Sequence, residues 1–249
     1  MLQPLRVINL ASSLTPYLTG IKLQDSVAEE RRQGLVGDTL ILLQHYPVYT
    51  LGKRGKESDF RTSRKEIEAT GAEICSVPRG GEVTFHGPGQ LVAYPIVGVR
   101  QAGLGARAYV EGLEDSIIDC LAKYGITARG RVPGATGVWV AERKIAAIGV
   151  RISQGVSSHG LALNVDTDLS YFHHIVPCGI ADKEVTSIRK ELESVGRDGT
   201  ARMQQWTNAC PDGVRGGDLG GRRGPSLDLM QVADDFTKAF RSRLGFPPG

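Results

Sequence analysis

The chain has 249 residues, of which 41% are hydrophobic and 23% are charged, and its formal net charge is +3. This length and composition fit a globular protein with one large domain, and they do not require an accessory domain. A net charge this small does not suggest a surface for duplex nucleic acid, so the composition names no partner.

The apolar runs and the cysteine spacing bear on the compartment and on metal binding. No apolar run reaches membrane-spanning length, and residues 1–6 lack the hydrophobic segment of a secretory signal and show no clear transit peptide. The cysteines have no paired spacing, so neither a disulfide framework nor a zinc site is expected; they are Cys75, Cys120, Cys178 and Cys210. We therefore expect a thiol-reducing compartment, no metal and no cofactor.

The first half of the chain alternates helix and strand signals. Thr15 is expected to cap a helix that starts at Pro16 and ends near Gly34 or Gly37. An apolar strand is predicted at 39–43, followed by a glycine-rich basic loop from Gly52 to Gly55, a short helix at 66–71 and a strand at 72–77. Residues 82–86 and 91–96, separated by the turn 87–89, predict a hairpin around which the chemistry should gather.

The second half begins with a helix at 106–124 whose apolar residues recur every four positions, with Cys120 in the core and Gly125 at its end. Residues 136–141 and 144–152 predict a hairpin, and 161–165 the next strand. Ser226 is expected to cap a last helix that Gly245 closes. This mixture favours an α+β fold, a single domain over residues 1–249 with a mostly antiparallel sheet flanked by helices.

Residues 195–224 differ from the rest of the chain, because they contain eight glycines and five arginines with almost no apolar periodicity. A flexible insertion before the last helix is expected there. Its arginines either contact acidic carrier proteins or belong to a solvated spacer.

Cys178 is the first candidate for chemistry. It lies between Pro177 and Gly179, in a bend that could present its sulfur to a cleft, whereas buried structural cysteines usually lie in periodic apolar segments. The alternatives are a nucleophile and a small hydrophobe under a loop.

Lys144 and the histidines are the candidate partners. Lys144 begins a strand and is either solvated or close enough to Cys178 to stabilise its thiolate. His159 is either a base for the cysteine or a donor to a loop. His173 and His174 would point to opposite sides of an extended segment, which makes them a poor metal pair.

Two glycine-containing turns flank residues 82–86. Arg79-Gly80-Gly81 precedes them and Gly87-Pro88-Gly89 follows. Glycine lets backbone amides approach a ligand closely, so the segment is either a substrate cradle or two tight turns in a compact sheet. The spacing matches no phosphate-binding motif.

Four ordered motifs together closely resemble the lipoyl(octanoyl) transferases: residues 79–90, 144–149, 158–164 and 175–179. The resemblance runs from about Leu40 to Leu192. It implies the catalytic fold shared by biotin and lipoate-protein ligases, and it implies transfer of an octanoyl or lipoyl group from acyl carrier protein to a specific lysine of a lipoyl domain.

The resemblance also assigns roles to residues. Cys178 matches the family's nucleophile and Lys144 the lysine that lowers the pKa of that thiol. A positioning role is expected for His159 and Asn164. The acyl group is implied to contact Arg79, Gly80, Gly81, Glu82, Val83, Thr84, Phe85, His86, Ala147, Ile148, Gly149, Gly160, Leu161 and Ala162. Small residues would leave room for an octanoyl chain, so bulky replacements at Gly149 or Ala162 are expected to shorten the preferred chain.

The implied partners are octanoyl-acyl carrier protein as donor, and the lipoyl domains of 2-oxoacid dehydrogenase complexes and the glycine-cleavage carrier protein as acceptors. The compartment would be a bacterial cytoplasm or a mitochondrial matrix, with no membrane or nucleic acid partner. Two alternatives stay open: an ATP-dependent lipoate or biotin ligase on the same fold, which needs no cysteine nucleophile, and a non-catalytic carrier-binding protein.

Overall fold

The computed structural model describes residues 3–176, 184–198 and 227–248, without the side chains of 195–198. Cys178, Cys210, Ser226 and residues 199–224 of the expected insertion lie outside these ranges.

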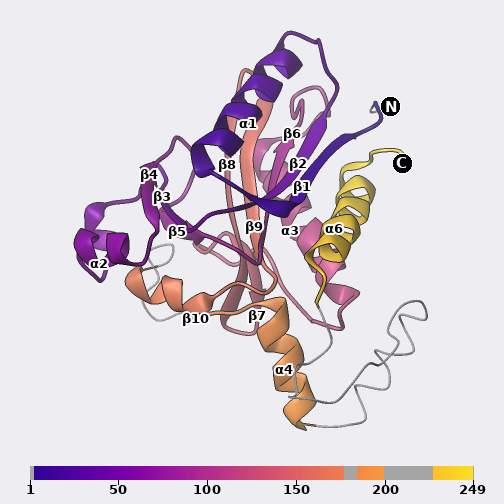
Figure 1. The fold of residues 1–249 in the computed structure, drawn as a ribbon. Helices are drawn as coiled ribbons and strands as arrows, with labels where there is room; N and C mark the ends of the chain where they lie inside the picture. The colour runs from indigo at the N-terminus through magenta and orange to yellow at the C-terminus, as the bar shows by residue number, and fades with distance from the viewer. Residues whose placement is uncertain (1–2, 177–183, 199–226, 249) are drawn as a thin grey trace.

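A mixed sheet forms the centre of the described part (Figure 1). Its strands are β1 (Arg6–Thr15), β2 (Thr39–His45), β6 (Gln90–Ile96), β9 (Val156–Asn164), β8 (Arg143–Ser153) and β10 (Glu184–Val185) in spatial order, with β7 (Gly137–Val140) also paired to β8. The pairs among β2, β6, β9, β8 and β7 are antiparallel, whereas β1 and β10 add to the two ends in parallel. The expected α+β fold with a mostly antiparallel sheet is confirmed.

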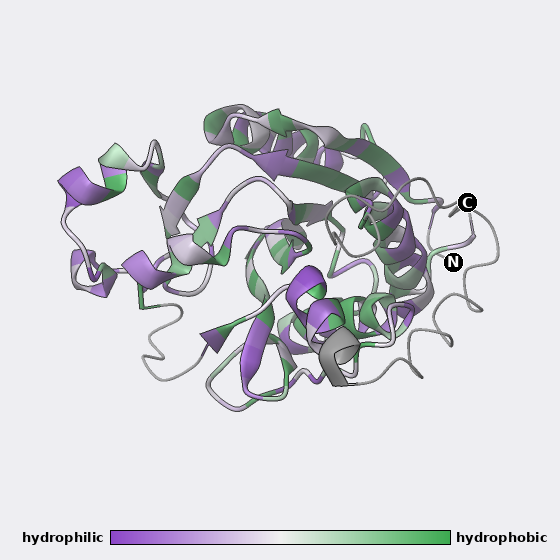
Figure 2. Ribbon diagram, turned by 60° about the horizontal axis from the view of Figure 1, so that its bottom comes forward, coloured by the Kyte–Doolittle hydropathy of each residue, from purple (hydrophilic) through white to green (hydrophobic). Residues whose placement is uncertain are grey.

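The sheet buries both faces because its strands alternate two sets of apolar side chains. In β2, Leu40 and Leu42 belong to the cluster under α3 (Ala106–Ala122) and α6 (Leu229–Leu244), while Ile41 and Leu43 belong to the cluster under α1 (Tyr17–Arg32). This is the two-residue period of a strand covered on both sides. The helices accordingly carry both hydrophobic and hydrophilic stretches (Figure 2).

A second, smaller sheet has the order β4-β3-β5, from β4 (Glu73–Ser76), β3 (Val48–Leu51) and β5 (Val83–His86). The expected hairpin of residues 82–86 and 91–96 is therefore wrong, because β5 belongs to this sheet and β6 to the large one. β5 leaves the large sheet because its Phe85 packs in a separate apolar cluster with Tyr49 and Phe172. The turn at 87–89 thus connects two sheets.

Other local expectations are also corrected. Thr15 is the last residue of β1, and Pro16 precedes α1 without a side-chain cap. Asp228 caps α6, because its carboxylate accepts the N–H of Met230. His173 and His174 lie in the 3₁₀ helix η2 (Leu169–His174), because the chain turns back there toward β3 and does not extend.

Some elements are not signalled by the sequence patterns. These are β1, β3, the one-turn η1 (Glu57–Asp59) and α4 (Ile188–Asp198), which carries helix into residues 195–198 of the expected insertion. The expected short helix is observed as α2 (Arg64–Ala69), and Cys120 is fully buried as predicted. Within the described ranges, no helix has the length and apolar character needed to cross a membrane.

Candidate functional site

A cleft opens between the two sheets beside α1. It is lined by Tyr17, Arg79, Gly81, Glu82, Val83, Thr84, His86, Val92, Tyr94, Ala147, Ile148, Gly149, His159, Gly160, Leu161 and Ala162. All the residues that the resemblance assigns to the acyl group therefore line this cleft, except Gly80 and Phe85.

Gly80 and Phe85 support its walls. The Gly80 amide donates to the carbonyl oxygen of Val150 at 3.1 Å, which ties the 79–81 loop to β8. The Phe85 ring stacks on Tyr171 with 4.4 Å between centroids, on the far side of β5 from the cleft. Both residues thus shape the site from outside it.

Sequence reasoning missed Tyr17, Val92 and Tyr94 as lining residues. Val92 and Tyr94 are two positions apart on β6 and so share a face, a signal that strand alternation offered. The phenol of Tyr94 donates to Nε2 of His45 at 2.8 Å, and His45 Nδ1 donates to the carbonyl oxygen of Thr15 at 2.9 Å. The polar end of Tyr94 is thereby satisfied, and its ring is held beside the cleft.

Two glycines of the site have a structural role in addition to the expected one of leaving room for a ligand. A Cβ on Gly160 would lie 2.1 Å from the carbonyl oxygen of Ala93, and a Cβ on Gly149 would lie 2.7 Å from that of Gly80. Both positions therefore let backbone segments approach each other, beyond leaving room for a ligand. Ala162 already carries a Cβ and lines the cleft, so a larger side chain at this position would enter it.

Buried polar side chains form a continuous hydrogen-bonded row from one sheet to the other. Arg79 donates to the hydroxyl and carbonyl oxygens of Thr50, both at 2.8 Å. The Thr50 hydroxyl donates to Nε2 of His86 at 3.4 Å, because the proton of the neutral His86 ring lies on Nδ1. His86 Nδ1 lies 2.8 Å from Oε1 of Gln90.

The row continues to the edge of the large sheet. The Gln90 amide nitrogen donates to Oδ1 of Asn164 at 2.9 Å, and the Asn164 amide nitrogen donates to the carbonyl oxygen of Thr186 at 3.0 Å. This direction makes Gln90 Oε1 an acceptor, so His86 must carry its proton on Nδ1. Asn164 thus joins the row to Thr186, whose N–H donates to the carbonyl oxygen of Lys144 at 2.9 Å.

The histidines around the cleft are neutral. Burial, with a contribution from the Arg79 guanidinium, lowers the pKa of His86 to about 3 and that of His159 to about 4, and burial alone lowers that of His45 to about 4. The backbone N–H of His159 donates to the side-chain oxygen of Gln24 on α1 at 2.6 Å, which fixes the residue in place. A neutral ring in this position suits a binding role.

Lys144 lies in a second cavity that shares Thr84, Ala147 and Ala162 with the cleft. Only 5% of the residue is exposed, so the solvated alternative is wrong. Its ammonium lies 5.3 Å from the centroid of the Trp139 ring. Phe172 and Val185 also line this cavity, and they come from the chain on either side of the Pro-Cys-Gly motif.

Two other cysteines, Cys75 and Cys120, have thiols whose pKa is raised. Burial raises the pKa of Cys120 to about 12 and is the largest cause of a raised pKa at Cys75. A thiolate nucleophile needs the opposite shift. Across the described part of the chain, no cluster of three or more histidine, cysteine, aspartate or glutamate side chains is arranged to hold a metal ion.

Comparison with known sequences identifies relatives over most of the chain. Residues 16–210 match the family described as the lipoyl protein ligase A/B catalytic domain. The mitochondrial octanoyltransferase LIP2 of Arabidopsis thaliana is 53% identical over 179 residues, which cover 72% of this chain and 76% of the relative. The octanoyltransferase of Solibacter usitatus is 50% identical over 185 residues, covering 72% and 83%.

Solved structures share the fold at low sequence identity. A lipoate-protein ligase A bound with ATP aligns with a TM-score of 0.63 at 12% identity, covering all of this chain and 89% of the other. A bi-partite lipoate protein ligase from Thermoplasma acidophilum aligns with a TM-score of 0.59 at 15% identity, covering 99% and 85%. The biotin protein ligase of Aquifex aeolicus with biotin and ATP reaches 0.51 at 14% identity, covering 96% and 70%.

Proposed function

The chain belongs to the family of lipoyl protein ligase A/B catalytic domains, and from this premise we propose that Cys178 and Lys144 carry out its chemistry. The overall activity is octanoyl transfer in protein lipoylation, since relatives at about 50% identity over most of the chain are octanoyltransferases. The finer proposal concerns which residues act and which proteins supply and accept the acyl group.

The first step is thioester exchange. The Cys178 thiolate attacks the carbonyl carbon of the octanoyl thioester on acyl carrier protein and the new C–S bond forms. The carrier's sulfur leaves as a thiolate that takes up a proton from the Lys144 ammonium, which leaves Lys144 neutral for the second step. One thioester replaces another at nearly constant free energy, so no ATP is consumed. The buried Lys144 ammonium stabilises the cysteine thiolate before attack.

The second step is aminolysis. An ε-amine of a lipoyl domain attacks the octanoyl-cysteine carbonyl, the C–N bond forms, and Cys178 leaves as a thiolate. A lysine amine, with an ordinary pKa of about 10.4, is mostly protonated near neutrality and must lose a proton before attack. Lys144 in its neutral form takes this proton.

The observation that carries the proposal is the composition of the Lys144 cavity. Phe172 and Val185, which both line it, bracket the segment that contains Cys178, and Val185 pairs with Lys144 across β10 and β8. The cavity also shares three lining residues with the apolar cleft. An acyl chain in the cleft would therefore have its carbonyl end directed toward Lys144.

The donor is proposed to be octanoyl-acyl carrier protein, and the acceptors are proposed to be lipoyl domains of 2-oxoacid dehydrogenases and the glycine-cleavage carrier. The bi-partite lipoate protein ligase of Thermoplasma acidophilum, which shares the fold, was described together with its E2 lipoyl domain. This supports the proposed class of acceptor. The compartment would be a bacterial cytoplasm or a mitochondrial matrix, in line with the bacterial and plant mitochondrial relatives. Residues 195–224 would be an insertion in one catalytic domain.

The test is a transfer assay with octanoyl-acyl carrier protein and an apo lipoyl domain, followed by intact mass of the lipoyl domain with and without ATP. We expect one octanoyl group to be added at the same rate in both conditions. Octanoylation that required free octanoate and ATP would instead favour the ligase alternative. No octanoylation in any condition would favour the carrier-binding alternative.

A further inference from the structure

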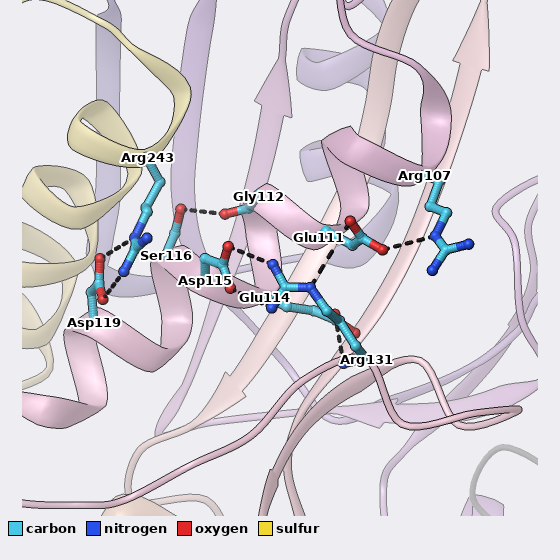
Figure 3. Close-up of polar contacts among 9 residues, drawn as sticks. All are labelled: Arg107, Glu111, Gly112, Glu114, Asp115, Ser116, Asp119, Arg131 and Arg243. Carbon is cyan, nitrogen blue, oxygen red and sulfur yellow. Dashed lines mark hydrogen bonds and ion pairs between the residues drawn. The ribbon is translucent and has the colours of Figure 1, made fainter.

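Glu114 on α3 is a buried carboxylate that the mechanism above does not use. Only 2% of the residue is exposed, and its two oxygens accept the backbone N–H groups of Arg131 at 2.9 Å and Gly137 at 3.1 Å. Its neighbours Glu111 and Asp115 contact arginine side chains at the surface of the same helix (Figure 3). Glu114 is therefore the residue of α3 that holds the backbone at 131–137.

That backbone packs tightly against both the carboxylate and the lysine. A Cβ on Gly130 would lie 2.9 Å from Oε2 of Glu114. Gly137 has φ of +131°, and a Cβ there would lie 2.7 Å from Cε of Lys144 and 2.5 Å from the carbonyl oxygen of Ala146. Gly137 thus donates its N–H to Glu114 on one side and leaves room for the Lys144 side chain on the other.

The same segment supplies the aromatic wall of the lysine cavity. Val138 pairs with Ala146 but Trp139 pairs with Lys144, so β8 has one extra residue at this point, a β-bulge. Bulges redirect side chains next to functional sites. The Trp139 indole N–H donates to the carbonyl oxygen of Ala135 at 2.9 Å, which fixes the ring beneath the ammonium.

We propose that Glu114 is a positioning residue for Lys144: by holding the amides of Arg131 and Gly137, it fixes the segment that directs the lysine ammonium into its cavity. This inference rests on the proposed roles of Lys144 and Cys178. A buried carboxylate that accepts two amides holds them through charge-assisted bonds, which neutral side chains replace poorly.

The test measures how the reactivity of Cys178 depends on pH. Alkylation by iodoacetamide is followed at the Cys178 peptide by mass spectrometry in the full chain, and the midpoint gives the apparent thiol pKa. Lys144→Ala should raise that midpoint toward the ordinary thiol value of about 8.5. Glu114→Gln keeps the volume but can accept only one of the two amides, so it should raise the midpoint in the same direction.

Kinetics provide a second readout. For Glu114→Gln we expect kcat of octanoyl transfer to fall about tenfold to a hundredfold, as for a misplaced catalytic group, with KM for the donor changed less than about threefold. Glu111→Gln is the matched control, because Glu111 lies on the same helix and pairs with Arg107 and Arg131 at the surface. It should keep the midpoint and kcat of the parent.

If Glu114→Gln does not fold, Glu114→Asp is used in its place, because it keeps the charge but is one methylene too short to reach both amides. A folded Glu114 variant with the parent midpoint and kcat would overturn the inference. So would a variant whose KM rises as much as kcat falls while the midpoint is unchanged. If Lys144→Ala leaves the midpoint unchanged, the proposed lysine–cysteine pairing itself fails, and the inference falls with it.

Discussion

At the residue scale, Ala162 controls the junction between the cleft and the lysine cavity, because it lines both. Its side chain is a single methyl group, as is that of Ala147, which also lines both cavities. Gly149, the other position considered, would bring a Cβ against the backbone of Gly80, so a substitution there would disturb the wall as well as the space.

Ala162→Leu is therefore expected to change chain-length preference. If the added carbons exclude two methylenes of the substrate at about 0.8 kcal/mol each, octanoyl transfer should fall roughly tenfold relative to butyryl transfer. The ratio of kcat/KM for the two donors checks this, and the exposed Ala108→Leu on α3 serves as the control. An unchanged ratio in Ala162→Leu would mean that the acyl chain lies elsewhere.

Tyr94→Phe tests the buried hydrogen bond beneath the cleft. Removing the phenol oxygen leaves Nε2 of His45, which accepts from it at 2.8 Å, without this donor in a buried position. We expect the free energy of unfolding to fall by about 1–3 kcal/mol. Urea denaturation measures it, with the exposed Tyr46→Phe as control, which should change stability by less than about 0.5 kcal/mol. Equal stabilities of the two variants would contradict this account.

Residue-level prediction from sequence succeeded and failed for identifiable reasons. The motifs predicted residues that the structure places around one cleft, because turn glycines and the arginine beside them stand close together in the sequence. Tyr17 and the bonding direction of His86 could not be predicted, because both depend on contacts between segments far apart in the chain. No sequence pattern marked Glu114, because its two hydrogen bonds reach backbone amides 17 and 23 positions away in the chain.

At the element scale, the site depends on two sheets that meet at β5 and β6. Apolar alternation predicted most strands, but it could not assign β5 to a second sheet, because pairing partners are a long-range property. The short strand β3 was hidden between a tyrosine and a glycine-rich loop. The bulge opposite Lys144 likewise appears only when β7 and β8 are paired.

Gly160→Ala tests the contact between β6 and β9. Its Cβ would lie 2.1 Å from the carbonyl oxygen of Ala93, so the strands must separate or bend. We expect a loss of more than about 3 kcal/mol of unfolding free energy, as for overpacking of a rigid core. Gly105→Ala is the control, because a Cβ there meets no atom within 4 Å, and it should cost less than about 1 kcal/mol. A thermally stable Gly160→Ala would show that the strands are not packed this closely.

At the scale of the whole molecule, three buried histidines make stability depend on pH. The folded-state pKa values of His45, His86 and His159 are about 4, 3 and 4, below the ordinary value of about 6.5. The unfolded chain therefore binds more protons between these values, so stability is complete above about pH 6.5 and is lost as the pH falls toward 4.

His45→Gln isolates one part of this dependence, since His45 does not line the cleft. The unfolding free energy of each protein at pH 7.5 is the reference for its values at lower pH. Between pH 6 and pH 4.5 the unfolding free energy of the variant should fall less steeply than that of the parent. The difference between the two slopes should approach about 1.4 kcal/mol per pH unit, the contribution of one titrating group. Urea unfolding at a series of pH values measures both slopes. An identical slope would show that His45 is not neutral in the folded state.

The most direct test of the central claim is the intact mass of the enzyme after incubation with octanoyl-acyl carrier protein alone. The account predicts that the parent gains the mass of one octanoyl group, that peptide mapping places it on Cys178, and that adding an apo lipoyl domain removes it. Cys178→Ser should gain no thioester and transfer no octanoyl group. A Cys178→Ser protein that octanoylates the lipoyl domain at the parental rate would contradict the account.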